Sequence, residues 1–404
     1  MKSSWKTKRL DDVCQFSNGL WKGESPPFVN IGVIRNTNFT KEGTLDDSDI
    51  AYLDVEAKKL EKRRLQFGDI ILEKSGGGPK QPVGRVALFD KEQGDFSFSN
   101  FTAALRVLDP HELDFRFLHK FLYWTYLSGV TEGMQSHSTG IRNLDGDAYK
   151  AIKISFPSLA EQQRLVGILN EAFDGIANAK ENAKENRENA RAIFESHLQS
   201  VFTHRGKVWT ETTIGQHIRF IDYRGRTPEK TESGLRLITA KNVKMGYLQE
   251  TPMEFVAPDS YDGWMTRGIP QLGDVLFTTE APLANVAQLD TDEKVVFAQR
   301  IIIMQPDNSK LARTFLKYLL LSQPVQQRIN AKGTGATVKG IKASLLRTVQ
   351  ISFPKSLAEQ EQIVAKLDAL HEETQRLESI YEQKLAALEA LKRSLLYSAF
   401  SRQL

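Results

Sequence analysis

Two stretches of this 404-residue chain carry apolar residues at alternating spacings of three and four. A repeat with an average period of 3.5 residues is typical of a helix that buries one narrow seam against a second helix. The seam positions include Leu169, Ile176, Asn186 and Ile193 in the first stretch, and Leu367, Leu377, Lys384 and Leu388 in the second. The pattern therefore predicts two long helices that form a coiled coil. Polar Asn186 and Lys384 occupy the same position of the repeat, where a polar residue commonly sets register.

The two stretches are copies of one another. Residues 154–157 and 351–354 both read Ile-Ser-Phe-Pro, and Leu-Ala-Glu-Gln follows at 159–162 and at 357–360. From these leucines on, the two copies align without a gap at a constant offset of 198. Ser158 and Ser356, with Glu161 and Glu359 three residues later, have the spacing of a capping box. Neither copy contains glycine or proline after Gly175, so each predicts one helix of about 65 Å at ~1.5 Å per residue. Each helix leaves a globular region and the chain must return, which favours antiparallel intramolecular pairing over a dimerisation rod.

The regions before each helix also resemble one another. Both contain Gly-Asp followed by an aliphatic strand, at Gly68-Asp69 and at Gly273-Asp274, and both contain a basic residue before asparagine, at 35–36 and 241–242. Short strands separated by frequent turn residues, with a helix near the end, predict mixed α/β domains with a curved sheet. The predicted class is α+β with an internal pseudo-twofold repeat. The predicted organisation is domain 1–157, helix 158–204, domain 205–354 and helix 355–404.

Composition and charge narrow the class of protein. The chain is long enough for two or three domains, and it has no apolar run near the ~20 residues that a membrane span needs. The N-terminal residues lack an apolar signal core, and a single cysteine, Cys14, excludes an internal disulfide and fits a reducing cytoplasm. The net charge is +4. Residues 205–350 hold 20 basic and 14 acidic residues, a surplus compatible with a polyanionic partner.

Motifs that would indicate catalysis are weak. The segment Ser25-Pro26-Pro27-Phe28 resembles the tetrapeptide with which amino-methyltransferases hold a flipped base, but no glycine-rich turn for a methyl donor accompanies it. The loops 75–80 and 333–339 are rich in glycine but lack the Gly-Lys-Ser/Thr ending of a nucleotide-binding loop. The seven histidines show no metal-ligand spacing, and no nucleophile lies beside a base. The sequence therefore predicts a protein that is not an enzyme and holds no metal.

Polar loops with basic and aromatic residues recur at equivalent places in both halves. Such side chains hydrogen-bond base edges or hold phosphates, so these loops are the predicted DNA-binding residues. In the first half they are Asn18, Trp21, Lys22, Lys74, Ser75, Lys80, Gln81, Arg85, His137, Ser138 and Arg142. In the second half they are Tyr223, Arg224, Arg226, Lys241, Asn242, Lys244, Lys332, Thr334, Thr337, Lys339 and Lys342. A mobile surface loop is the alternative for the glycine-rich segments, and a solvated surface group is the alternative for any single residue.

With two such domains and two such helices, the chain resembles the specificity (S) subunit of type I restriction-modification systems. The resemblance covers the whole chain and is carried by the paired Ile-Ser-Phe-Pro and Leu-Ala-Glu-Gln segments, the two Gly-Asp turns, and the segments 140–144 and 337–341. The tandem helix motif is specific for this family, whereas the sequences of the recognition domains diverge with their targets.

The resemblance implies a subunit without catalytic activity that recognises double-stranded DNA. Each domain would recognise one half of a split, asymmetric site, and the helices would set the gap between the halves. Two methyltransferase (M) subunits would bind the helices, and two motor-nuclease (R) subunits would join the complex. S-adenosylmethionine, ATP and Mg²⁺ are expected only in those partners, so this chain itself needs no cofactor.

Two other interpretations remain open at the level of sequence. A coiled-coil scaffold whose two domains bind proteins would show no sequence-dependent protection of DNA and would have no methyltransferase partner. A single-chain enzyme that fuses methyltransferase and specificity functions would bind a methyl donor. The absence of a methyl-donor motif counts against the fused enzyme.

Overall fold

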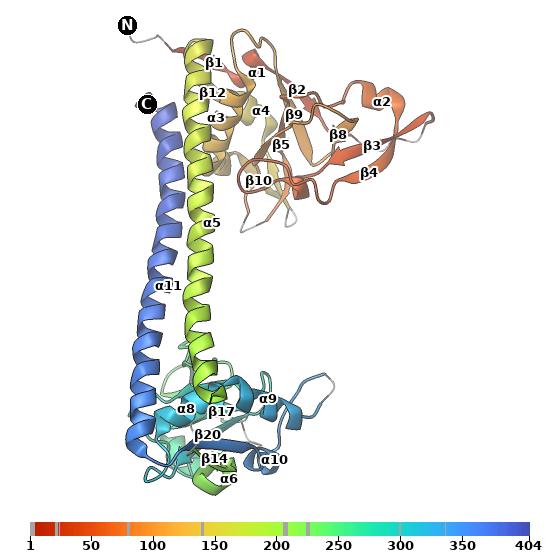
Figure 1. The fold of residues 1–404 in the computed structure, drawn as a ribbon. Coiled ribbons are helices and arrows are strands. Elements are labelled where there is room, and N and C mark those ends of the chain that lie inside the picture. The colour runs from red at the N-terminus through yellow and green to blue at the C-terminus, as the bar shows by residue number, and fades with distance from the viewer. Residues whose placement is uncertain are drawn as a thin grey trace. The chain divides into compact units, whose positions relative to one another are not determined.

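The computed structural model describes residues 5–20, 23, 25–78, 81–138, 141–204, 209–223, 227–298, 300–335 and 337–404 (Figure 1). Its internal contacts divide the chain into two units. Residues 1–183 and 383–404 form the first unit, and residues 184–382 form the second. Each unit combines one globular domain with stretches of the two long helices, whereas the sequence analysis treats the helices as segments of their own.

The first domain is built on a four-stranded antiparallel sheet in the order β2–β9–β5–β7. Its strands are β2 (Cys14–Asn18), β5 (Ile70–Glu73), β7 (Val86–Leu88) and β9 (Thr102–Val107). All four residues of β5 are buried, which agrees with a short aliphatic strand covered on both faces. Helix α3 (Phe115–Leu127) packs Phe117, Leu118 and Leu122 into the same core. Asp114 caps this helix, because its side chain accepts from the N–H groups of Arg116 and Phe117.

Smaller sheets complete the first domain. A three-stranded sheet has the order β4–β3–β8, a second has the order β10–β11–β6, and β1 pairs with β12. Their bounds are β1 (Lys6–Arg9), β3 (Phe28–Ile34), β4 (Ala51–Glu56), β6 (Ser75–Gly77), β8 (Phe96–Phe98), β10 (Gln135–Ser138), β11 (Ile141–Leu144) and β12 (Lys153–Phe156). The short helices are α1 (Leu10–Val13), η1 (Asn36–Asn38), α2 (Ala57–Glu61), η2 (Val130–Met134) and α4 (Gly146–Lys150).

The second domain repeats this architecture with little similarity of sequence. Its four-stranded sheet has the order β14–β20–β17–β18, its three-stranded sheet has the order β16–β15–β19, and β13 pairs with β21. The strands are β13 (Trp209–Thr213), β14 (Ile218–Asp222), β15 (Leu235–Ile238), β16 (Glu254–Val256), β17 (Val275–Thr278), β18 (Val286–Gln288), β19 (Val296–Phe297), β20 (Ile301–Pro306) and β21 (Gln350–Pro354). The helices are α6 (Ile214–His217), η3 (Pro258–Ser260), α7 (Tyr261–Trp264), α8 (Arg313–Leu321), α9 (Gln323–Lys332) and α10 (Ala343–Arg347).

The predicted Gly-Asp turns precede the central strand of each domain. Gly68 and Gly273 adopt φ angles of 91° and 85°, which favour glycine because it has no Cβ. Each following aspartate is buried and its Oδ2 accepts a hydrogen bond of 2.8 Å from a backbone N–H, that of Gln66 in the first domain and that of Gln271 in the second. The same two residues therefore form the same turn in both domains.

The long helices are α5 (Leu159–Thr203) and α11 (Leu357–Phe400), and they pack together. Within the first unit Lys180 forms an ion pair with Glu389. Within the second unit Arg191 pairs with Glu378 at 2.7 Å and Arg187 with Glu382 at 3.9 Å. From Arg187 to Arg191 on α5 the partner on α11 moves back from Glu382 to Glu378, so the helices are antiparallel in the second unit. In the first unit Lys392 lies over the ring of Phe173, before Lys180 on α5 and after Glu389 on α11, which gives the same antiparallel order. The predicted antiparallel coiled coil is confirmed.

The glutamine of each Leu-Ala-Glu-Gln segment fastens a long helix to its domain. Gln162 is fully buried: its Oε1 accepts from the N–H of Asp114 at 2.9 Å, and its Nε2 donates to the carbonyls of Glu112 and Pro157, both at 2.9 Å. Gln360 makes the equivalent three bonds to Ala312, Lys310 and Pro354, each at 2.8 Å. The expected capping box is only partly seen. At the start of α11 the N–H of Glu359 donates to Oγ of Ser356 at 3.4 Å. At the start of α5 the carboxylate of Glu161 accepts from Arg164 instead.

The helix seam follows the predicted positions over part of its length. Leu169, Ile176 and Leu367 are buried, and Leu377 and Leu388 are half-buried. Asn186, Ile193 and Lys384 are exposed, Ile193 by 53 %, so this part of the predicted seam is corrected. The half-buried residues there are each one position later: Arg187, Phe194 and Leu385. A straight helix has 3.6 residues per turn, and a strict 3.5-residue extrapolation drifts off its face.

The two ends of the described chain lie close together within the first unit. The guanidinium of Arg402 lies over the ring of Trp5, 5.3 Å from its centroid. Phe400, at the end of α11, contacts Phe117 and Trp124 of α3 with ring centroids 5.3 and 5.6 Å apart. The C-terminal end of α11 is thereby part of the first domain's core.

Candidate nucleic-acid interface

Three loops of the first domain meet at Lys74, the residue that follows β5. The N–H of Lys74 donates to the carbonyl of Phe101 at 3.0 Å, and the carbonyl of Lys74 accepts from the N–H of Leu144 at 2.8 Å. These bonds join the turn after β8, the turn after β5 and the end of the β10–β11 hairpin. Polar side chains that are distant in the sequence are therefore gathered at one edge of the sheet.

The side chain of Lys74 extends this junction to a fourth segment. Its Nζ donates to Oδ1 of Asn18, at the end of β2, over 2.9 Å. Partial burial lowers the pKa of Lys74 below its usual value. Two predicted contact residues are therefore adjacent, and a cation lies among neutral polar groups.

The β10–β11 hairpin is anchored to the same place through Ser75. Oγ of Ser75 donates to Oδ1 of Asn143 at 2.6 Å, and β6 pairs with β11 through Ser75–Asn143 and Gly77–Arg142. Arg142 donates from Nη1 to Oε1 of Gln135 at 3.3 Å. Ser75 and Arg142, both predicted contact residues, thus belong to one small sheet.

Arg85 supports the interface from inside the domain. Its Nε and Nη2 donate to the two carboxylate oxygens of Glu73 at 2.8 and 2.9 Å, and Glu73 is only 1 % exposed. The guanidinium also donates to the carbonyls of Asn36 and Phe39 at 3.0 and 3.3 Å. Gln81 places its side-chain amide 3.0 Å from Nε of Arg85. Because these groups occupy the Arg85 guanidinium, we exclude it from direct DNA contact and assign it a positioning role.

The second domain has the same junction at Thr279, the residue after β17. The N–H of Thr279 donates to the carbonyl of Arg300 at 2.8 Å, and the N–H of Ile341 donates to the carbonyl of Thr279 at 2.9 Å. Gly340 forms bridges to both Glu280 and Thr334. Residue by residue, Thr279 corresponds to Lys74 and Arg300 to Phe101, because Glu73 pairs with Thr102 as Thr278 pairs with Ile301.

Arg300 and Glu280 are candidate interface residues that the sequence analysis did not name. Nε of Arg300 forms an ion pair with Oε1 of Glu280 at 2.9 Å, and both side chains are about half exposed. Neither residue belongs to a motif, and they are 20 positions apart in the chain. They are close because β17 pairs with β20. In the sequence, this proximity could have been found only by aligning the strands of the second half with those of the first.

The remaining predicted residues of the second domain lie on the loops around this junction. Lys332 ends α9 and donates from Nζ to Oγ1 of Thr348 at 2.9 Å. Thr334 holds Gly340 through two backbone bonds of 2.8 and 2.9 Å. The exposed predicted residues are Lys241, Thr334, Thr337, Lys339 and Lys342, and Lys244 is half-buried.

Two predicted contact residues lie inside the second domain. Asn242 is 1 % exposed: its Oδ1 accepts from the N–H of Thr239 at 2.9 Å, and its Nδ2 donates to three carbonyls of residues 249–252. Tyr223 is buried, and its hydroxyl donates to the carbonyl of Gly268 at 2.7 Å. We therefore exclude both from the interface. The first-domain counterpart of Asn242 is Asn38, which makes the same turn, and not Asn36 as the basic-asparagine alignment suggested.

Several predicted residues lie outside the part of the chain that the structure describes. They are Trp21, Lys22, Lys80, Arg224 and Arg226, together with the side chains of His137 and Ser138. Their proposed contact with DNA stays a prediction.

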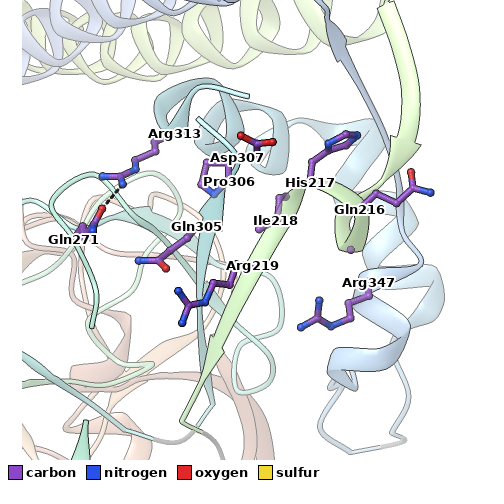
Figure 2. A pocket seen from close by; sticks show the side chains of 11 residues that line it. Gln216, His217, Ile218, Arg219, Gln271, Gln305, Pro306, Asp307, Arg313 and Arg347 are labelled. Atoms are coloured by element: carbon purple, nitrogen blue, oxygen red, sulfur yellow. Dashed lines mark hydrogen bonds between the residues drawn. The ribbon is translucent and has the colours of Figure 1, made fainter. Parts of the chain in front are cut away.

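An open pocket of about 550 Å³ lies at the other ends of β14 and β20, away from the Thr279 junction (Figure 2). It contains three arginines. Arg313 donates to Oε1 of Gln271 and lies 3.5 Å from Oδ1 of buried Asp274, and Arg347 covers the ring of Phe220 at 4.3 Å. Arg313 is thus engaged in the fold, and the pocket is separate from the candidate interface.

Among the described residues, no group of histidine, cysteine, aspartate or glutamate side chains could hold a metal ion. None of their helices is both long and apolar enough to cross a membrane. Cys14 is buried, and burial raises the pKa of its thiol to about 12.

Comparison with known proteins places the chain in a family. The model of the type I restriction modification DNA specificity domain matches residues 2–187 and 268–389. The chain therefore belongs to the family of type I restriction-modification DNA specificity proteins. It is a specificity protein of this class and not a catalytic subunit.

Relatives and solved structures agree with this assignment. The chain is 24 % identical to the EcoKI specificity subunit of Escherichia coli K12, over 92 % of this chain and 82 % of that protein. It is 22 % identical to the MjaVIII specificity subunit of Methanocaldococcus jannaschii, where the match spans 58 % of this chain and 59 % of the relative. A match to a putative specificity subunit of Haemophilus influenzae is 33 % identical but spans only 34 % of that protein.

Two solved structures share the fold. A chain from a study of complex assembly and conformational transition of the type I restriction-modification system has a TM-score of 0.79, with 19 % identity and full coverage of both chains. The HsdS subunit of Thermoanaerobacter tengcongensis has a TM-score of 0.61, with 18 % identity and coverage of 99 % and 97 %.

Proposed function

We propose that this protein recognises a bipartite, asymmetric DNA site, with one domain for each half-site. The observation that carries the proposal is the repeated junction: the loops after β5 and β17 are held by the same backbone bonds but present different side chains. A conserved frame with variable polar loops suits two domains that share a way of binding DNA but differ in the bases they recognise. Different half-sites follow from the different loops.

The chemistry of the loops supports DNA as the ligand. Lys74 and Asn18 lie at the first junction, and the exposed Lys241, Lys339 and Lys342 lie on the loops around the second. Lysine and threonine can contact phosphates, while arginine, asparagine and glutamine can hydrogen-bond to base edges in the major groove. We therefore place the DNA at the loops after β5 and β17, with the sheets as rigid supports.

We further propose that the long helices bind two methyltransferase subunits and that two motor-nuclease subunits complete the complex in the cytoplasm. Large apolar side chains on the helices, namely Ile193, Ile380, Leu391 and Tyr397, are 42–55 % exposed, which suits a surface covered by a partner. S-adenosylmethionine, ATP and Mg²⁺ would be held by those partners.

The test is to map modification in cells. The chain is co-expressed with the methyltransferase encoded beside it in a host without DNA methylation, and N6-methyladenine is located by long-read sequencing. We expect a split motif of two short half-sites around a fixed gap. If the two proteins form a soluble complex but methylation shows no motif beyond that of the methyltransferase alone, the proposal fails and the scaffold interpretation replaces it.

A further inference from the structure

The backbone of Arg300 is held in a conformation that arginine rarely adopts. Its φ is 79°, a left-handed value that brings Cβ close to the backbone and is normally left to glycine or asparagine. Ala281 and Ala284, in the turn between β17 and β18, have φ values of 50° and 67°. Such backbone strain clusters at functional sites. All three residues lie in turns beside the Thr279 junction.

The surrounding loops fix both the backbone and the side chain of Arg300. Its carbonyl accepts from the N–H and the Oγ1 of Thr279 at 2.8 and 3.3 Å. Glu280, the next residue, forms the 2.9 Å ion pair with Nε of Arg300. Glu280 is in turn held by the bridge to Gly340, where a Cβ added to the glycine would lie 3.2 Å from Cβ of Glu280.

Beside this pair is a pocket of about 250 Å³, lined by apolar side chains such as Leu237 and Ala298 and by polar ones, among them the acidic Glu254. Arg300 lines it together with Thr227, Lys230, Thr239 and Lys241. Arg300 is 47 % exposed and Glu280 is 44 % exposed, so the guanidinium keeps donors that face outward from the protein. The equivalent first-domain position holds Phe101, which has no donor, and the equivalent of Glu280 is Ser75.

We propose that Arg300, oriented by Glu280, forms a guanine-recognition site in the second domain. This inference depends on the function proposed above and specifies one base contact of it. The pair Arg300–Glu280 has no net charge, which weakens its attraction for phosphate but leaves the directional donors of the guanidinium. Two parallel N–H donors match the O6 and N7 acceptors of guanine in the major groove, which is the commonest specific contact of arginine with DNA. The strained backbone and the carboxylate pre-orient those donors.

The test uses the full complex of this chain with its methyltransferase partner. Arg300→Gly removes the side chain and suits a φ of 79°, so the variant should fold at least as well as the wild type. Arg219→Ala is the matched control, since Arg219 is an exposed arginine at the other end of β14. Modification mapping is combined with measured affinities for DNA in which each base pair of both half-sites is substituted in turn.

We expect the wild type to require guanine at one position of one half-site. Arg300→Gly should lose discrimination at that position alone, by about five- to a hundredfold, and should leave the other half-site and the gap unchanged. Glu280→Gln should weaken the same preference less, and Arg219→Ala should change nothing. The inference is overturned if Arg300→Gly keeps the full wild-type specificity, or if it weakens binding equally for every DNA variant, as loss of a phosphate contact would. A wild type without a split motif would instead remove the proposed function itself, so the two failures are distinguishable.

Discussion

The two domains connect the turn after the central strand to the neighbouring loop by different chemistry. In the first domain Glu73, at the end of β5, forms an ion pair with Arg85, just before β7. Arg85 also donates to the carbonyl of Phe39 in the neighbouring loop. In the second domain Thr278 and Asn285 occupy the equivalent positions, and Asn285 donates to the carbonyl of Val243 at 2.9 Å. A charged pair and a neutral pair thus hold the same two loops together.

The comparison separates the residues that build the frame from those that vary. The Gly-Asp turns and the glutamines at the start of the long helices are identical in both domains. The cation at the loop junction, by contrast, is Lys74 after β5 in the first domain but Arg300 before β20 in the second. A stable backbone frame allows the polar side chains to change position, which agrees with the proposal that the two domains recognise different half-sites.

The largest effect is expected from breaking the charged pair. Arg85→Ala would leave the buried carboxylate of Glu73 without its cation, and removal of one partner of a buried pair costs about 3–5 kcal/mol. Asn285→Ala removes only neutral hydrogen bonds and should cost about 1 kcal/mol. Denaturant unfolding of both variants measures the difference.

A transplanted pair sharpens this prediction. Glu73→Thr combined with Arg85→Asn copies the second domain into the first and should recover more than half of the loss of Arg85→Ala. Arg64→Ala, which breaks an exposed ion pair with Asp95, is the control and should change stability by less than about 1 kcal/mol. Equal losses in Arg85→Ala and Asn285→Ala would show that the two junctions do not differ as described.

The second prediction concerns a feature that the domains share. Gln162→Ala and Gln360→Ala should each destabilise the protein by about 2–3 kcal/mol, because each leaves buried backbone donors and acceptors without partners. The neighbouring exposed Gln163 provides the control, and Gln163→Ala should be nearly neutral. Thermal unfolding is the measurement, and a large difference between the two glutamine variants would contradict their equivalence.

The smallest effect is a difference in pH response. Lys120 of α3 packs over the ring of Phe173 at 4.8 Å, and its pKa is lowered to about 8 by burial and by Lys392, with Asp174 acting in the opposite direction. The equivalent residue of the second domain is Tyr318, whose pKa is raised by burial and by Asp368 and which is neutral over this range. The second domain therefore packs a neutral side chain at the position where the first domain packs a lysine.

The sign of the effect follows from the direction of the shift. The folded state binds the Lys120 proton less tightly than the unfolded chain, so the charged lysine costs stability below about pH 8. This cost should disappear as the pH rises from 8 towards the unfolded value near 10.5. Lys120→Met should gain about 1–2 kcal/mol at pH 7 and lose that rise. Denaturant unfolding from pH 7 to pH 10 tests it; an unchanged pH profile in the variant would refute the assignment.

Sequence patterns predicted those parts of the fold that are determined by residues close together in the sequence. The bounds of α5 and α11, the turns at Gly68 and Gly273 and the strands after them all follow from local spacing. The seam prediction failed at Asn186, Ile193 and Lys384, because a small error in period accumulates along a helix. Local patterns were therefore reliable over short distances only.

The interface was less accessible, because its residues meet through strand pairing. Lys74 and Asn18 are 56 positions apart, and their contact requires the neighbouring positions of β5, β9 and β2. Residue type alone did not distinguish the buried, fully bonded Asn242 from an exposed asparagine. Arg85 was predicted as a DNA contact from its residue type and loop, but its guanidinium is paired with buried Glu73 inside the domain.

The contact between Arg402 and Trp5 brings two residues from opposite ends of the described chain together within the first unit. When the ends of a polypeptide are adjacent, the order in which its halves are translated is not dictated by the folded structure. A permuted gene that encodes the second domain first, with a short linker joining residue 404 to residue 1, should fold to the same set of contacts. If it does, the two domains are interchangeable in genetic order, and a genome could exchange them at the repeated Ile-Ser-Phe-Pro segments without changing the helices.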